Sequence, residues 1–163
     1  MSSVDQKGQE WIDTTSASIK EAFDLFDKDK SDAIIQEEVG TVMRYLGVYP
    51  SERALVLEIL PQMQDDEPTG YVHYKKFEQK MLQLLASREC EPDSSDIILQ
   101  AFRILDKDNK GYVSADLLES LLTTKGTPFR PKELDSFFLV AKDSETGNIY
   151  YEDYAALLSK ARK

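Results

Sequence analysis

Apolar residues near the start of the chain recur at helical spacing. The positions of this pattern are Ile19, Phe23 and Phe26. They share one face of a helix that runs to about residue 26, and that face is expected to be buried. Ser16 or Ser18 is placed to cap the helix, because a hydroxyl oxygen can accept a hydrogen bond from the first free backbone amides.

The segment ahead of this helix is polar apart from Trp11 and Ile12. It carries no apolar period, so we expect a flexible arm over residues 1–14. Trp11 either packs on the protein's own body, which the large buried area of aromatic side chains favours, or anchors the arm on a partner.

The unit of helix, acidic loop and helix recurs four times, which is a repeat signature. The 12-residue loops span 27–38, 65–76, 106–117 and 142–153. Each has a β-branched residue at its eighth position; these are Ile34, Val72, Val113 and Ile149. They lie 38, 41 and 36 residues apart. We expect neighbouring loops to pair through these residues in a short antiparallel ladder.

The repeats predict an all-α fold of four EF-hand helix–loop–helix units in two lobes. The N-lobe covers 15–86, a polar linker covers 87–95, and the C-lobe covers 96–160. The helix that begins near Ser51 contains Pro61, which removes a backbone hydrogen bond, so we expect it to bend or end early. A second helix is expected to run from about Gln36 to Tyr45 and to stop at Gly47. Pro131 suits the first turn of the seventh helix.

Loop one comes nearest to a calcium site, which needs oxygen ligands at fixed loop positions and a bidentate glutamate at position 12. Its candidate metal ligands are Asp27, Asp29, Ser31, the Ala33 carbonyl and Glu38. Asp32 stands where a glycine is expected, and must adopt a positive φ at a cost of about 1 kcal/mol. Two interpretations remain open, a weak calcium site and a loop that folds without an ion.

The other three loops lack a competent set of ligands. Loop two ends in Lys76, whose ammonium would repel a cation, and loop three ends in Leu117. Lys110, at position 5 of loop three, is placed to neutralise the acidic residues Asp106 and Asp108. Loop four opens on Lys142 and gives no competent cage even when the next residue, an aspartate, is taken as the first ligand.

Composition narrows the classes of partner. The chain has 163 residues, 41% hydrophobic and 31% charged, with a formal net charge of -10. This charge disfavours nucleic acid and acidic membranes, and favours metal ions or basic protein segments. No run of apolar residues approaches the roughly 18 of a spanning helix, no signal peptide is evident, and Cys90 is the only cysteine. We therefore expect a cytoplasmic protein in a reducing compartment.

Nothing in the sequence indicates an enzyme, since there is no phosphate-binding glycine loop, no metal-hydrolase histidine pair and no activated nucleophile. The apolar residues available to line a cleft in each lobe are mostly leucines. Examples are Leu82, Leu84, Leu85, Leu117, Leu118, Leu121, Leu122, Leu157 and Leu158. Stiff side chains of this kind suit one dedicated amphipathic helix better than many partners, for which flexible methionines are typical.

The four loops in sequence order resemble the calmodulin superfamily over roughly residues 15 to 160. Three segments resemble its axonemal members more closely: 38–47, the Glu-Pro-Thr-Gly loop at 67–70, and 148–154. This resemblance implies a subunit of the nexin–dynein regulatory complex on ciliary or flagellar doublet microtubules, part of the axonemal cytoskeleton. It would hold helices of coiled-coil partner subunits, with weak or no calcium binding. The alternatives are a calcium sensor acting through loop one and a light-chain-like subunit of a motor.

Overall fold

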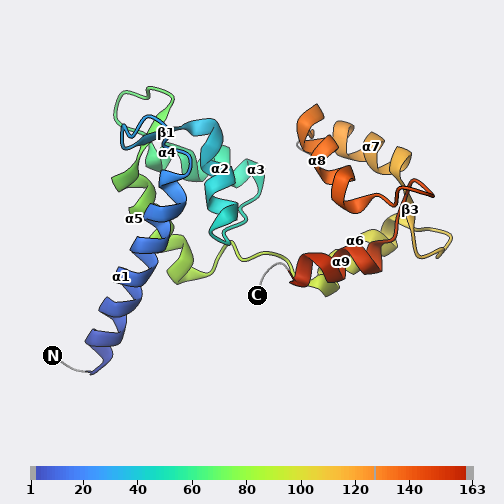
Figure 1. Cartoon of the computed structure of the whole chain (residues 1–163), viewed down its shortest axis with the longest axis horizontal. Coiled ribbons are helices and arrows are strands. Elements are labelled where there is room, and N and C mark those ends of the chain that lie inside the picture. Colours follow the sequence, from blue (N-terminus) through green and yellow to red (C-terminus); the bar gives the residue numbers. More distant parts are fainter. Residues whose placement is uncertain (1–2, 127, 161–163) are drawn as a thin grey trace. The chain divides into compact units, whose positions relative to one another are not determined.

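The structure is a computed structural model that describes residues 3–126 and 128–160 (Figure 1). Residues 1 and 2 of the expected arm lie outside this range. The chain divides into two compact units, Met1–Pro92 and Asp93–Lys163, here called the N-unit and the C-unit. The lobe bounds given above, at 86 and 96, stay predictions.

The N-unit holds two helix–loop–helix hands in sequence order. Its elements are α1 (Ser3–Asp24), β1 (Ala33–Ile35), α2 (Gln36–Tyr45), α3 (Glu52–Ala54), η1 (Leu55–Ile59), α4 (Leu60–Met63), β2 (Tyr71–His73) and α5 (Tyr74–Ser87). The second helix starts and stops where the sequence predicts, and Gly47 just beyond it has φ +86°.

The first helix begins earlier than predicted. α1 is continuous over 22 residues from Ser3, so neither Ser16 nor Ser18 caps its start, and the described part of the expected arm is helical (Figure 1). Residues 5–14 of this helix are exposed to solvent, and the Gln9 amide donates a hydrogen bond of 2.8 Å to Asp13 Oδ1. Trp11 is 42% exposed, so it is not buried on the body of the N-unit.

Pro61 is accommodated inside a helical segment that continues past it. Ser51 caps this segment by accepting a hydrogen bond from the Ala54 amide, 3.1 Å long. The turn before Pro61, η1, is a π-helix. A widened turn fits a proline, which lacks an amide hydrogen and whose ring clashes with the carbonyl four residues earlier in an α-helix. The segment reaches Met63, so the helix does not end early.

The two loops of the N-unit pair in the predicted register. β1 and β2 are antiparallel, and Ile34 lies opposite Val72. Both side chains are buried in one cluster with the two central phenylalanines, Phe23 of α1 and Phe77 of α5, whose ring centroids lie 5.3 Å apart. The remaining members of this buried cluster are Ile19, Ala22, Val39, Val42, Met43, Val48, Leu55, Ile59, Met63, Met81 and Leu84.

The C-unit repeats the same arrangement with a smaller core. Its elements are α6 (Ser95–Leu105), β3 (Val113–Ser114), α7 (Ala115–Thr124), α8 (Pro131–Ala141), β4 (Asn148–Ile149) and α9 (Tyr151–Lys160). β3 and β4 are antiparallel with Val113 opposite Ile149, again as predicted. The buried cluster around them is limited to Val113, Leu118, Ala141, Ile149 and Tyr151.

The last helix of the N-unit, α5, and the first helix of the C-unit, α6, are separate helices. Arg88 takes the left-handed conformation directly after α5, which ends that helix. The Cys90 carbonyl accepts a hydrogen bond of 2.7 Å from the Tyr49 amide. α6 then starts at a new cap, because Ser94 Oγ accepts a hydrogen bond from the Ile97 amide. Among the described residues, no helix is sufficiently long and apolar to cross a lipid bilayer.

Candidate functional site

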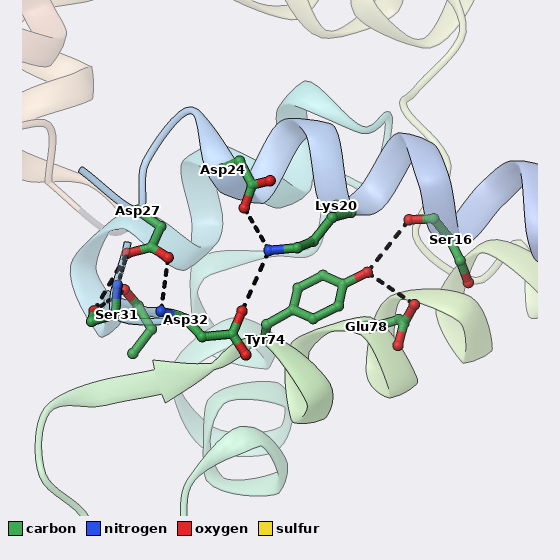
Figure 2. Close-up of polar contacts among 9 residues, drawn as sticks. Ser16, Lys20, Asp24, Asp27, Ser31, Asp32, Tyr74 and Glu78 are labelled. Atoms are coloured by element: carbon green, nitrogen blue, oxygen red, sulfur yellow. Dashed lines mark hydrogen bonds and ion pairs between the residues drawn. The ribbon is translucent and has the colours of Figure 1, made fainter. Parts of the chain in front are cut away.

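Loop one is folded around the carboxylate of Asp27, which is buried (Figure 2). The Ser31 amide donates to Oδ1 at 3.0 Å, and the Asp32 amide donates to Oδ2 at 2.8 Å. The Ser31 hydroxyl lies 3.3 Å from Asp27 Oδ1 and 3.4 Å from the Ala33 carbonyl oxygen. Three of the predicted ligand residues, Asp27, Ser31 and Ala33, are therefore brought together by the turn.

The non-glycine residue at position 6 has the backbone conformation that the sequence predicts. Asp32 has φ +61°, in the left-handed region. Its carboxylate points back toward α1, where Lys20 Nζ lies 3.3 Å from Asp32 Oδ1 and 2.6 Å from Asp24 Oδ1 (Figure 2). The hydrogen bond to Asp24, and then that to Asp32, raises the pKa of Lys20. The ion pairs thus tie the strained turn to the preceding helix.

Tyr74, at the start of α5, carries this polar network to a second helix. Its hydroxyl donates to Glu78 Oε1 at 2.9 Å and lies 3.4 Å from the Ser16 carbonyl oxygen of α1 (Figure 2). Lys20 Nζ lies 4.7 Å from the centre of the Tyr74 ring, a cation–π distance. Burial, followed by the bond to Glu78, raises the pKa of Tyr74. α1, loop one and α5 are therefore fixed to each other by side chains of the protein.

The structure does not assemble the whole predicted ligand set. Among residues 3–126 and 128–160, no group of three or more His, Cys, Asp or Glu side chains is arranged to hold a metal ion. Asp29 and Glu38 thus do not join Asp27 in such a group. The donor chemistry of loop one still suits calcium, which takes carboxylate and carbonyl oxygens. The calcium site at Asp27, Asp29, Ser31, Ala33 and Glu38 stays a proposal.

In loop two the lysine at position 12 contacts the aspartate at position 1. Lys76 Nζ lies 3.0 Å from Asp65 Oδ1 and donates to the Gln64 carbonyl at 2.7 Å. His73 Nε2 lies 3.6 Å from Asp65 Oδ2. The hydrogen bond from Lys76 lowers the pKa of Asp65. The Lys76 ammonium therefore contacts the Gln64 carbonyl and the carboxylate of Asp65. Asp65 is the residue that would be the first ligand of a bound ion.

In loop three the first aspartate is satisfied by neutral donors. Asp106 Oδ1 accepts from the Lys110 amide at 3.0 Å, and Oδ2 accepts from the Gly111 amide and the Tyr151 hydroxyl, both at 2.8 Å. These bonds, the Lys110 amide first, lower the pKa of Asp106. The Lys110 ammonium pairs with Asp108 at 3.4 Å, as predicted, while its amide and not its charged end contacts Asp106.

The turn of loop four is formed around the carboxylate of its second residue, Asp143. Asp143 Oδ1 accepts from the amides of Glu145 at 3.1 Å and Thr146 at 2.8 Å, and from the Thr146 hydroxyl at 3.0 Å. The Gly147 amide donates to the Asp143 carbonyl at 3.0 Å. The Thr146 amide, first among these donors, lowers the pKa of Asp143. The carboxylate is thus used to shape the turn.

The C-unit leaves much of its apolar side-chain surface exposed or only partly buried. None of the eleven residues of α6 is buried, although the helix contains six large apolar side chains. Several apolar side chains that pack around the small core are only partly buried: Leu99, Phe102, Leu105, Leu122, Phe137, Phe138 and Tyr154. Ile104 and Leu139 are 76% and 86% exposed. The C-unit therefore has apolar surface that its own core does not bury.

Two contacts of this site were missed by the sequence reasoning. The sequence predicts that Lys76 repels a cation and does not predict its bond to Asp65. It does not predict the contact of Tyr151 with Asp106 either. The available signal was its position, since Tyr151 is residue 10 of loop four and Tyr74 is residue 10 of loop two. The same position in the two hands therefore carries the same residue type.

Comparison with known proteins agrees with this architecture. The family model described as an EF-hand domain pair matches residues 97–159. The mouse protein named dynein regulatory complex protein 8 is 34% identical over 140 residues, which cover 86% of this chain and 85% of the mouse protein. The Chlamydomonas reinhardtii protein of the same name is 34% identical, covering 88% of this chain and 89% of the relative.

The fold also matches a solved structure. The Physarum polycephalum myosin II regulatory domain superposes with a TM-score of 0.72 at 26% identity, covering 90% of this chain and 96% of the other. The predicted all-α, calmodulin-like fold is thereby confirmed. With paired EF-hand loops in both units and relatives at this identity over most of their length, the chain belongs to the family of EF-hand proteins named dynein regulatory complex protein 8.

Proposed function

We propose that this protein is a non-enzymatic adaptor subunit of a dynein regulatory complex in the ciliary or flagellar axoneme. The observation that carries the proposal is the uncovered apolar surface of the C-unit, with an α6 in which no residue is buried. An apolar surface of this kind marks a protein interface. The names of the mouse and Chlamydomonas relatives support the complex and its location.

The partner segment is an amphipathic helix from a coiled-coil subunit of that complex. EF-hand pairs receive such helices on their apolar side chains, which anchor one apolar face of the helix. Leu157 of α9 and Ile97 of α6 are 48% and 52% exposed, and α6 and α9 contact each other. The leucine-rich, methionine-poor surface suits one long-lived partner. The net charge of -10 favours basic residues on the polar face of the helix.

Calcium has a minor part in this proposal. Loop one, with Asp27 and Glu38, is the candidate for a weak site, while loops two to four are held by side chains and amides of the protein. An adaptor of this kind folds and binds its partner in chelator. Calcium at loop one adjusts a complex that has already formed.

A pull-down from ciliated cells tests the adaptor role. The chain is used as bait with chelator and with calcium, beside the variant Ile97→Ser/Leu157→Ser and the control Leu25→Ser. Leu25 is 59% exposed in the N-unit, so all three changes are expected to leave folding nearly unaltered. We expect subunits of the regulatory complex to be captured in both buffers by the wild type and by Leu25→Ser, and lost with the double variant. Capture that disappears in chelator, or that survives the double variant, would contradict the proposal.

The second candidate is a light-chain-like subunit of a motor, favoured by the TM-score of 0.72 with a myosin II regulatory domain. Cross-linking mass spectrometry in intact axonemes separates the two. Cross-links from α6 and α9 to a motor heavy chain would support this candidate, and cross-links to regulatory-complex subunits would exclude it.

A further inference from the structure

We propose that the Tyr151 hydroxyl takes the place of a calcium ion in loop three and keeps the C-unit folded at any calcium concentration. The inference concerns the regulation of the adaptor surface on the C-unit, and its cellular meaning rests on the function proposed above. It assigns to Tyr151 a role that belongs to no side chain of the usual EF-hand ligand set.

Asp106 occupies position 1 of loop three, and the residue is 9% exposed. A buried carboxylate needs hydrogen-bond donors or a cation near both oxygens. In loop three, two backbone amides supply donors, and the Tyr151 hydroxyl supplies another to Oδ2 at 2.8 Å. This set satisfies the first ligand of the loop without an ion.

The position of the Tyr151 hydroxyl is fixed by packing. Tyr151 is the first residue of α9 and is 2% exposed. Its ring stacks on Phe102 of α6, with centroids 5.5 Å apart and planes 8° from parallel. A stacked, buried ring has little rotational freedom, so the hydroxyl is held in place before any ligand arrives. One side chain thereby joins α9, α6 and loop three.

The N-unit provides an internal comparison, because Tyr74 stands at the same loop position as Tyr151. Its hydroxyl donates to Glu78 and lies near the Ser16 carbonyl of α1. Asp27, at position 1 of loop one, is satisfied by donors of its own loop, Ser31 and Asp32. The carboxylate at position 1 of loop one thus accepts from its own loop, whereas that of loop three also accepts from a side chain of the neighbouring hand.

The other ligand positions of loop three are also poorly suited to a cation. A cation that bound Asp106 through Oδ2 would compete with the Tyr151 hydroxyl, which donates to that oxygen. Asp108, the next acidic position, is paired with the Lys110 ammonium at 3.4 Å. Position 12 is Leu117, which offers no oxygen. Loop three thus retains the shape of a calcium loop while its own groups fill the place of the ion, and any response to calcium is left to loop one.

Hydrogen exchange followed by mass spectrometry on the whole chain tests this inference. The wild type, Tyr151→Phe and the matched control Tyr74→Phe are each measured with chelator and with millimolar calcium. In the wild type we expect loop-three amides to exchange at the same rate in both buffers. In Tyr151→Phe we expect the Lys110 and Gly111 amides to exchange about tenfold faster or more, since a hydrogen bond to a charged group is lost. Tyr74→Phe leaves loop three unchanged.

Two results would overturn the inference. One is a wild-type loop three whose exchange slows when calcium is added, since an ion would then bind there. The other is a Tyr151→Phe variant whose loop-three amides exchange as in the wild type. If Tyr151→Phe unfolds the whole C-unit, the wild-type comparison between the two buffers decides alone. The experiment contains no partner, so its failure leaves the pull-down untouched, and a failed pull-down leaves this hydrogen bond untouched.

Discussion

The ion pair between Lys76 and Asp65 predicts a pH-dependent effect of one side chain on stability. The pair lowers the pKa of Asp65 from its ordinary value of 3.8. A lowered carboxyl pKa stabilises the folded state above the unfolded pKa, and this stabilisation is lost as the pH falls through the folded pKa. Lys76→Met should therefore destabilise the protein more at pH 7 than below pH 3.8. Urea unfolding at several pH values measures the difference.

The neighbouring lysine serves as the control for this prediction. Lys75 is exposed, so Lys75→Met should change stability little at any pH. Part of the Lys76 effect stays at low pH, because its bond to the Gln64 carbonyl does not depend on the charge of Asp65. A Lys76→Met effect that is the same at all pH values would show that the ion pair does not stabilise the fold.

Position 6 of the loops predicts a second effect of a single residue. Gly111 has φ +82° and donates its amide to Asp106. A side chain in this left-handed region costs about 1–2 kcal/mol, so Gly111→Ala should destabilise the C-unit by that amount. Gly8→Ala in α1, where an added Cβ meets nothing within 4 Å, should instead stabilise by up to about 1 kcal/mol. Thermal unfolding of both variants checks the opposite signs.

The packing of α2 against η1 depends on a close approach at Gly40. A Cβ added there would lie 2.8 Å from Leu55 Cδ2, and Leu55 is buried. The clash should offset the gain in helix propensity that alanine brings, and shortening the opposing side chain should relieve it. We therefore expect Gly40→Ala and Leu55→Val to be non-additive, with the double variant more stable than the sum by about 0.5–1 kcal/mol. A double-mutant cycle by urea unfolding measures this, and simple additivity would contradict it.

The two β ladders were predictable from the sequence, whereas the start of α1 was not. The pairs Ile34–Val72 and Val113–Ile149 were predicted to the residue, since a repeated β-branched position fixes the register of both loops. The start of α1 at Ser3 was not predicted, because a hydrophobic period detects only those helical turns that bury one face. Residues 5–14 of α1 are all exposed, so this part of the helix has no hydrophobic period in the sequence.

The contacts between distant positions were beyond sequence reasoning for a different reason. Tyr151 and Asp106 are 45 positions apart, and their meeting depends on how the β3–β4 ladder sets α9 against loop three. The uncovered face of α6 was equally hidden, since an apolar helix reads the same in sequence whether its partner is in the same chain or another. The fold could be predicted from the repeats and the family from the resemblance of three short segments, whereas the donors to Asp106 are visible only in the structure.

The chain as a whole should unfold in two steps. The buried cluster of the N-unit contains fifteen described residues and that of the C-unit contains five, and stability follows the apolar area removed from water. We expect the C-unit to unfold first in calorimetry, with hydrogen exchange assigning each transition to its unit. A bound partner helix should raise the first transition and leave the second unchanged, because ligands stabilise only the part that binds them. A single transition would show that the two units unfold together, and a partner that raises only the N-unit transition would place the adaptor surface on the N-unit.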